Sequence, residues 1–302
     1  MRNGHGPIRS READIRYLGI ALGLIVGFIV VEIVVAVLSG SLALLADAGH
    51  MLADAGALAA SIWAARLALR LPDGTFTFGF KRAEILSAAG NGITLLVVAA
   101  LVTFESIHRL IHPSVVKGLS LVIVASAGVL VNLIVAFVLT EADRSRLNVE
   151  GAFRHIVTDL YGFLATLIAG IVILASKFER ADAIASLVVV VLMLNAGWGL
   201  LKVSGRVLLE AAPESADLNE VRAHLLEVAH VLDIHDLHAW TVTSDLPTLS
   251  AHVIVEESCF SDGHVPQIID QLQACLKGHF DLEHSTFQLE PAGHRDHEPG
   301  MH

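Results

Sequence analysis

Two pairs of residues in this sequence combine a histidine with an aspartate four positions later. His50 and Asp54 form one pair in "AGHMLADAG", and His155 and Asp159 form the other in "FRHIVTDLYG". On a helix, residues i and i+4 share one face and lie about 5–6 Å apart. Two such faces turned towards each other would present two imidazoles and two carboxylates to one point, a tetrahedral ligand set that Zn²⁺ favours. The sequence therefore predicts one metal site formed by all four residues.

Both pairs lie in apolar stretches of a very hydrophobic chain. Its 302 residues are 54% hydrophobic with a mean hydropathy of +0.64, which indicates several membrane spans. Six stretches are long enough to cross a bilayer as helices: 17–38, 42–70, 83–110, 118–140, 149–176 and 182–209. A charge inside the bilayer costs about 3 kcal/mol or more, and a bound dication would offset this cost. Hydrogen bonding between helices is the simpler interpretation of either pair, but two pairs of the same type and spacing favour the metal.

Lysine and arginine are distributed unevenly over the connections between these stretches. With the N-terminus inside, thirteen basic residues flank the inner ends, and four flank the outer ends: Arg109, Lys117, Lys177 and Arg180. Basic residues accumulate on the cytoplasmic side of membrane proteins, so both termini are predicted to be cytoplasmic. The polar N-terminal segment does not resemble a signal peptide, and this pattern suits a bacterial inner membrane.

The C-terminal part of the chain has a different character. Residues 211–302 carry 3 Lys/Arg against 16 Asp/Glu, a net charge of −13, and 11 of the 16 histidines. Such a segment repels nucleic acid and attracts divalent cations, so metal rather than nucleic acid is the expected partner. The chain's two cysteines, Cys259 and Cys275, do not indicate a disulfide framework.

The periodicity of this part predicts the order helix, strand, strand, helix, strand. The expected elements cover 218–229, 234–243, 249–256, 265–279 and 284–290. This αββαβ order is typical of a two-layer, ferredoxin-like or metallochaperone-like α+β domain. The predicted organisation is a cytoplasmic segment (1–16), an all-α six-helix transmembrane bundle (17–209), a cytoplasmic metal-sensing domain (210–291) and a disordered histidine-containing tail (292–302).

Four segments carry a specific family pattern: "SLALLADAGHMLADAGALA", "TFTFGFKRAEILSA", "NVEGAFRHIVTDLYGFLATL" and "HDLHAWTVTSDLPTLSAHVIV". They resemble the cation diffusion facilitator family, and more narrowly its zinc-transporting branch. The resemblance covers nearly the whole chain. It implies a homodimer that exports divalent cations from the cytoplasm in exchange for protons by alternating access, and a transporter rather than an enzyme.

The resemblance places the transport site on His50, Asp54, His155 and Asp159, the same residues that the spacing selects. Neutral imidazole is the metal ligand and titrates near neutrality, so protons compete with the metal at these four residues. A nitrogen donor at His50 favours Zn²⁺ over harder cations. Cd²⁺ and Co²⁺ are further candidate cargoes, and no organic cofactor is expected.

Two other functional classes compete with a carrier. A membrane-embedded zinc sensor, which binds without transporting, is the alternative to a carrier. An intramembrane metalloenzyme is disfavoured because the sequence has no His-Glu-x-x-His motif. In addition, four protein ligands leave no position on the metal for water.

Other polar residues of the membrane part have weaker predicted roles. Asp47 lies one turn before His50, where it either passes the cation on or hydrates a cavity. Arg82 and Glu210 match family positions for an interdomain charge pair. The alternative is an ordinary exposed salt bridge, which contributes little to stability. Interhelical hydrogen bonding is the favoured role of three residues in mid-span, with a cation or proton path as the alternative: Glu32, Asn91 and Asn132.

In the C-terminal part, the resemblance places metal ligands on His235 and His252. Glu290 is the expected third ligand, in a last strand where some relatives have His and Asp and this chain has Gln288 and Glu290. His284 is the next candidate and His238 the alternative. Zn²⁺ bound there would act as a regulatory ligand, because it neutralises repulsion between two acidic domains and draws the dimer together. Ordinary surface histidines are the competing interpretation. The remaining histidines of the terminal segment are expected to be disordered: His294, His297 and His302.

Overall fold

A computed structural model describes residues 7–39, 42–112, 118–214, 216–244, 246–280, 282 and 284–294 of the chain. The chain divides into two compact units, Met1–Gly205 and Arg206–His302. Each unit has its own buried core.

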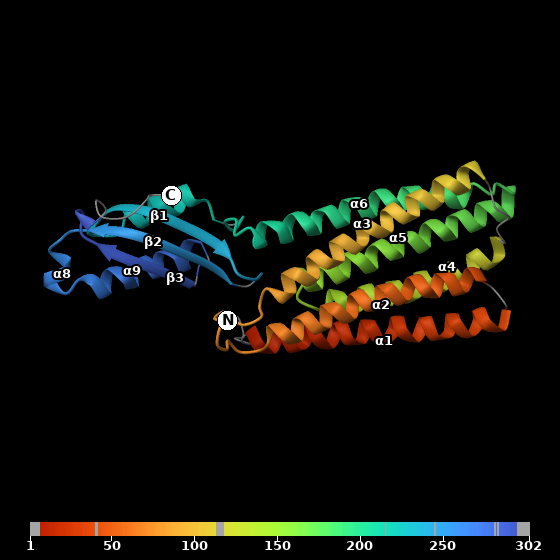
Figure 1. Ribbon diagram of the computed structural model, residues 1–302, viewed down its shortest axis with the longest axis horizontal. Helices are drawn as coiled ribbons and strands as arrows, with labels where there is room; N and C mark the ends of the chain where they lie inside the picture. The colour runs from red at the N-terminus through yellow and green to blue at the C-terminus, as the bar shows by residue number, and fades with distance from the viewer. Residues whose placement is uncertain are drawn as a thin grey trace. The chain divides into compact units, whose positions relative to one another are not determined.

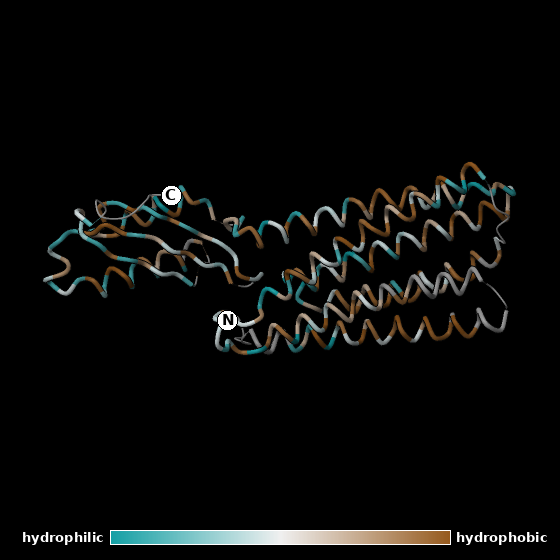
Figure 2. Tube along the Cα trace, viewed as in Figure 1, coloured by the Kyte–Doolittle hydropathy of each residue, from teal (hydrophilic) through white to brown (hydrophobic). Residues whose placement is uncertain are grey.

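The first unit consists of six long helices (Figure 1): α1 (Pro7–Ser39), α2 (Leu42–Ala68), α3 (Ala83–Ile111), α4 (Gly118–Thr140), α5 (Leu147–Ser176) and α6 (Ala181–Leu208). The six predicted stretches are confirmed. The main difference is that α1 begins ten residues before the predicted position 17, because the polar segment that precedes it continues the helix. Among the described residues, five of the helices are long and apolar enough to cross a membrane, and α2 contributes the shorter apolar segment Ala55–Ala68. Figure 2 shows hydrophobic residues recurring along all six helices.

Apolar side chains hold α1, α2 and α5 together. Met51 and Ala55 of α2 are 4% and 5% exposed, and they belong to one buried cluster with Ala152 and Ile156 of α5. Leu18 and Ile25 of α1 belong to the same cluster. The α2 residues that directly follow His50 and Asp54 therefore pack in the same cluster as α5 residues that flank His155.

Close helix approach and buried polar contacts complete the packing. A Cβ atom on Gly197 of α6 would lie 2.9 Å from the carbonyl oxygen of Gly92 on α3, so the two backbones meet without side chains between them. Asn91 of α3 donates to the hydroxyl of Ser61 on α2 over 3.3 Å, which confirms the interhelical hydrogen bond predicted for Asn91. Asn132 instead donates to the carbonyl of Gly128 in its own helix. The side chain of Glu32 lies outside the described residues.

A buried charge cluster joins α1, α3 and α5 at the end of the unit where these three helices begin. Arg146, the N-cap residue of α5, is 3.0 Å from the carboxylate of Asp14 and 3.9 Å from that of Glu84. The side chains of all three are at most 4% exposed. Asp143, which is 42% exposed, approaches Arg146 at 3.5 Å. The cluster fixes the N-terminal ends of three helices around one guanidinium.

The second unit contains the predicted αββαβ order with one added helical turn. Its elements are α7 (Leu218–Leu226), β1 (Val231–Thr241), β2 (Pro247–Val255), α8 (Cys259–Asp262), α9 (Val265–His279) and β3 (His284–Glu290). Asp217 is the N-cap of α7, and its carboxylate accepts from the backbone N–H of Asn219. The short α8 was not predicted, since four residues are too few to show a helical period.

The three strands form one sheet in the order β1–β2–β3, with β1 and β2 antiparallel and β2 and β3 parallel. Leu249, Ala251 and Val253 of β2 belong to the core that the sheet shares with α7 and α9. Alternate strand residues point to opposite faces. His252 and its neighbours on β1 and β3 are therefore available on the face that turns away from the helices.

Candidate metal centres

The membrane unit brings His155 and Asp159 together on α5. His155 Nε2 lies 3.7 Å from Asp159 Oδ2, with side-chain exposures of 7% and 15%. This is the geometry expected from i,i+4 spacing, because one helical turn stacks the two side chains on one face. The pair presents one nitrogen and one carboxylate donor at the same level of the bundle.

Asp159 borders a cavity of about 200 Å³ inside the six-helix unit. Every one of the six helices contributes to its lining, with Ile25 of α1, Met51 of α2 and Val98 of α3 among the apolar residues. Its polar lining residues are Asn132, Thr158, Asp159, Thr166 and Ser186. One water molecule needs about 30 Å³, so the cavity has room for a small hydrated ion. A carboxylate facing this space gives it cation-binding character.

The remaining predicted residues of the membrane site have only part of their structure described. His50 and Asp54 lie on α2, but their side chains, and that of Asp47, fall outside the described residues. Their convergence with the α5 pair stays a prediction. Arg82 belongs to the first unit and Glu210 to the second, so the predicted pair between them also stays a prediction.

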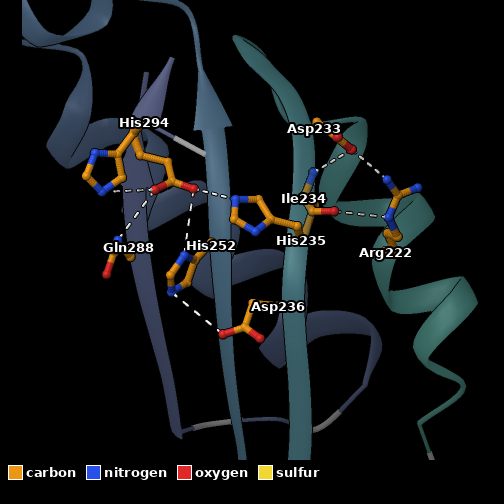
Figure 3. Close-up of polar contacts among 9 residues, drawn as sticks. Arg222, Asp233, Ile234, His235, Asp236, His252, Gln288 and His294 are labelled. Atoms are coloured by element: carbon orange, nitrogen blue, oxygen red, sulfur yellow. Dashed lines mark hydrogen bonds and ion pairs between the residues drawn. The ribbon is translucent and has the colours of Figure 1, made fainter. Parts of the chain in front are cut away.

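In the second unit, His235, His252 and Glu290 come together on the open face of the sheet. The structure pairs His235 on β1 directly with His252 on β2, and Glu290 lies on β3 beside Ile254. His235 Nε2 is hydrogen-bonded to Glu290 Oε1, and His252 Nδ1 is 3.7 Å from the same oxygen. Figure 3 shows both imidazoles directed towards one carboxylate. One donor atom from each of the three residues lies within 4.8 Å of the others.

Burial makes these three residues more than a surface cluster. The side chains of Glu290 and His235 are only 2% and 7% exposed, and that of His252 is 23% exposed. A carboxylate this deeply buried needs a positive partner to offset its desolvation. A divalent cation held by two imidazoles and this carboxylate would supply that charge, and the donor set suits Zn²⁺. His252 is the most exposed of the three residues, so an ion would enter the cluster beside it.

Two neighbouring groups were missed as members of this cluster. The register shift between His235 and His238 includes Asp236, whose φ is 48° and whose carboxylate lies 3.8 Å from His252 Nε2. A bulge re-aims side chains in this way, and an aspartate in the middle of a strand was the available signal. His294, assigned from sequence to the tail, places Nε2 at 3.7 Å from Glu290 Oε2.

The other two predicted histidines lie apart from the three. His284 begins β3, opposite Thr248, and is therefore six residues away from Glu290 along the strand. His238 is half-exposed and contacts the Asp236 carboxylate at 2.9 Å. His297 and His302 lie outside the described residues.

Comparisons with known proteins agree with this organisation. Residues 18–209 match the cation efflux transmembrane domain, and residues 213–292 match the cytoplasmic domain of cation efflux proteins. The chain is 38% identical over 295 residues to the zinc transporter ZitB of Escherichia coli, covering 96% of this chain and 93% of that protein. It is 32% identical over 291 residues to a cadmium, cobalt and zinc/H(+)-K(+) antiporter of Bacillus subtilis, with the same coverages.

A third relative is known both as a sequence and as a partial structure. The chain is 35% identical to the metal cation efflux system protein CzcD of Cupriavidus metallidurans, covering 92% of this chain and 87% of that protein. A solved metal-bound C-terminal domain of the CzcD transporter covers 25% of this chain and 99% of that domain, with 32% identity and a TM-score of 0.23.

Proposed function

This chain belongs to the cation efflux family, and we propose that it exports Zn²⁺ from the cytoplasm in exchange for protons, with Cd²⁺ and Co²⁺ as further cargoes. It is an integral membrane protein and a transporter of metal cations rather than an enzyme, as the motifs predicted. The relatives named for zinc, cadmium and cobalt support the choice of cargo, and the one named as an antiporter supports the coupling.

The proposed transport site consists of His50, Asp54, His155 and Asp159. The observation that carries the proposal is the His155–Asp159 pair, whose aspartate borders a cavity lined by all six helices. Further support comes from the buried cluster of α2 and α5, in which Met51 and Ala55 pack with residues flanking His155. Adding a second His/Asp pair from α2 would complete four ligands around one ion.

Proton coupling follows from the chemistry of these ligands. An imidazole binds metal only in its neutral form, and it titrates near neutrality. Metal binding therefore displaces protons, and protons arriving from the outer side displace the metal. Alternation between the two occupants lets the proton gradient drive the cation outwards. Basic residues at the inner flanks support an orientation with both termini in the cytoplasm, in a bacterial inner membrane.

Reconstituted vesicles test the transport site. We expect Zn²⁺ flux that accelerates with an imposed pH gradient and that falls to background in Asp159→Asn and Asp54→Asn. Asp182→Asn is the matched control, because Asp182 is another largely buried helix aspartate (15% exposed) that pairs with Arg109 and does not line the cavity. Full flux in both site variants would refute the site. Zinc binding without gradient-dependent flux in the unmodified protein would instead identify a sensor.

We further propose that the second unit binds regulatory Zn²⁺ through His235, His252 and Glu290 in a homodimer. Each domain carries a net charge of −13 over residues 211–302, so two of them repel, and bound dications reduce that repulsion. We expect Zn²⁺ to shorten the distance between spin labels on the two domains. Chelation should reverse the change, and Glu290→Gln should abolish it. An unchanged distance would refute the regulatory role and leave transport untouched.

A further inference from the structure

A second group of metal-ligating side chains lies at one corner of the C-terminal unit. His230 immediately precedes β1, Glu256 immediately follows β2, and the strands pair Val231 with Val255 at this end. Cys259 is the first residue of α8. An imidazole nitrogen, a carboxylate oxygen and the thiol sulfur all lie within 4.8 Å of one another. Three kinds of donor from three different segments therefore meet at one point.

The burial of these residues gives the corner the form of a site. Cys259 is completely buried, whereas the side chains of His230 and Glu256 are 40% and 49% exposed. The thiol is the buried donor at the base of the site. The imidazole and the carboxylate form its exposed rim, which a cation can reach from solution. His264 adds a second imidazole to this rim, stacked on His230 with ring centroids 5.4 Å apart.

The spacing of the donors is close to that of a metal shell. Ligand atoms around tetrahedral Zn²⁺ are about 3.4 Å apart, as bonds of about 2.0–2.3 Å require. His230 Nδ1 and Glu256 Oε2 are 3.0 Å apart. No pair of donor atoms exceeds 4.8 Å, so the sulfur has to approach by at most about 1.4 Å to complete such a shell.

The backbone holds the two rim residues in place. The N–H of Glu256 donates to the carbonyl oxygen of His230 over 3.1 Å. His230 has a φ of 69°, in the left-handed region where residues other than glycine are uncommon. A backbone hydrogen bond therefore joins the same two residues whose side chains supply the imidazole and the carboxylate.

We propose that His230, Glu256 and Cys259 form a thiolate-containing binding site for Zn²⁺ or Cd²⁺. Binding replaces the thiol proton, which passes to solvent, with a metal–sulfur bond. The soft thiolate favours Zn²⁺ and Cd²⁺ over Mg²⁺ or Mn²⁺. The site differs from the other two metal centres in its chemistry, because both of those contain only nitrogen and oxygen donors. An ion held here would join the start of β1, the end of β2 and α8.

Cobalt provides a direct readout of the sulfur. The full-length protein, reduced and in detergent, is titrated with Co²⁺ alone, and absorption from charge transfer between sulfur and cobalt is followed in the near ultraviolet. We expect this absorption in the unmodified protein and its loss in Cys259→Ser. Cys275→Ser is the matched control and should retain it. Burial, with help from the Glu227 carboxylate, raises the pKa of Cys275, which keeps that thiol protonated.

A second variant tests the site without disturbing the core. His230→Gly removes an exposed imidazole and tolerates the positive φ. We expect the Co²⁺ dissociation constant of the charge-transfer site to rise at least about tenfold, since even outer-shell partners of a metal change affinity by 10–100-fold. Absorption that is absent from the unmodified protein, that persists in Cys259→Ser, or that keeps its affinity in His230→Gly would overturn the proposal. Asp159→Asn and His235→Ala should leave the absorption unchanged, so a failure of the proposed transport function is recognised separately.

Discussion

Replacing Arg146 with methionine should destabilise the membrane unit by about 3–5 kcal/mol. Methionine keeps most of the side-chain volume but removes the charge that Asp14 and Glu84 share. At an effective dielectric constant of about 20, distances of 3.0 and 3.9 Å correspond to attractions of about 5.5 and 4.3 kcal/mol. Removing Arg146 also removes the desolvation cost of its buried guanidinium, which offsets several kcal/mol of these lost attractions. The remainder agrees with losses typical of breaking a buried pair, and corresponds to about a hundredfold to a few thousandfold in the folded-to-unfolded ratio.

Arg144 supplies the matched control, two positions away. Its side chain is 42% exposed, pairs with Glu150 at 2.9 Å and lies over the ring of Phe153. Arg144→Met should therefore cost no more than about 1–2 kcal/mol, the sum of an exposed ion pair and a cation–π contact. Unfolding in mixed micelles with increasing SDS, followed by helical circular dichroism, measures both variants. Asp14→Asn combined with Arg146→Met should recover part of the loss, because one of the two buried carboxylates is then neutral. Equal losses for Arg146→Met and Arg144→Met would refute the reasoning.

Two further predictions concern packing and thiol chemistry. Gly197→Ala places a methyl group 2.9 Å from the Gly92 carbonyl and should cost about 1–3 kcal/mol in the same unfolding assay, whereas Gly205→Ala in the same helix meets nothing within 4 Å and should cost little. Similar costs for the two variants would show that the α3–α6 contact is not tight. Burial and then the Glu227 carboxylate raise the pKa of Cys275, so its thiolate forms only at higher pH and its alkylation should have a pH midpoint above the ordinary value of about 8.5. Glu227→Gln should lower that midpoint part of the way towards the ordinary value. Peptide mass spectrometry at a series of pH values measures the alkylation of Cys275 separately from that of Cys259. A midpoint at or below the ordinary value would contradict the assigned environment.

Regular periodicity made much of this fold predictable. Stretches of about 20 apolar residues are helices in lipid because no other structure satisfies their backbone groups, and the six helices follow those stretches closely. The contact between His155 and Asp159 follows from the helical repeat alone. The meeting of His235, His252 and Glu290 follows from strand alternation once the strand order is known, because all three point away from the helices.

Features that depend on distant partners or on local irregularities do not follow from a periodic pattern. Arg146 meets Asp14 from more than a hundred positions away, and no periodic pattern relates the two. Parallel pairing of β3 with β2 places His284 opposite Thr248, so Glu290 rather than His284 approaches His235 and His252. Asp236 reaches His252 through a register shift, which a strand pattern of period two cannot express.

Arg146 anchors one end of α5, and Asp159 lies far from that anchored end. Asp159 lies thirteen residues beyond Arg146 on the same helix, and at 1.5 Å per residue this separation is about 20 Å. A tilt of about 10° around the anchored end would sweep the carboxylate through about 3.4 Å, while the metal–oxygen bond it is proposed to make is only about 2.0–2.2 Å long. A small angular adjustment at one end of the helix is therefore enough to assemble or dismantle an ion's coordination near its middle, and the charged joint need not break for this to happen.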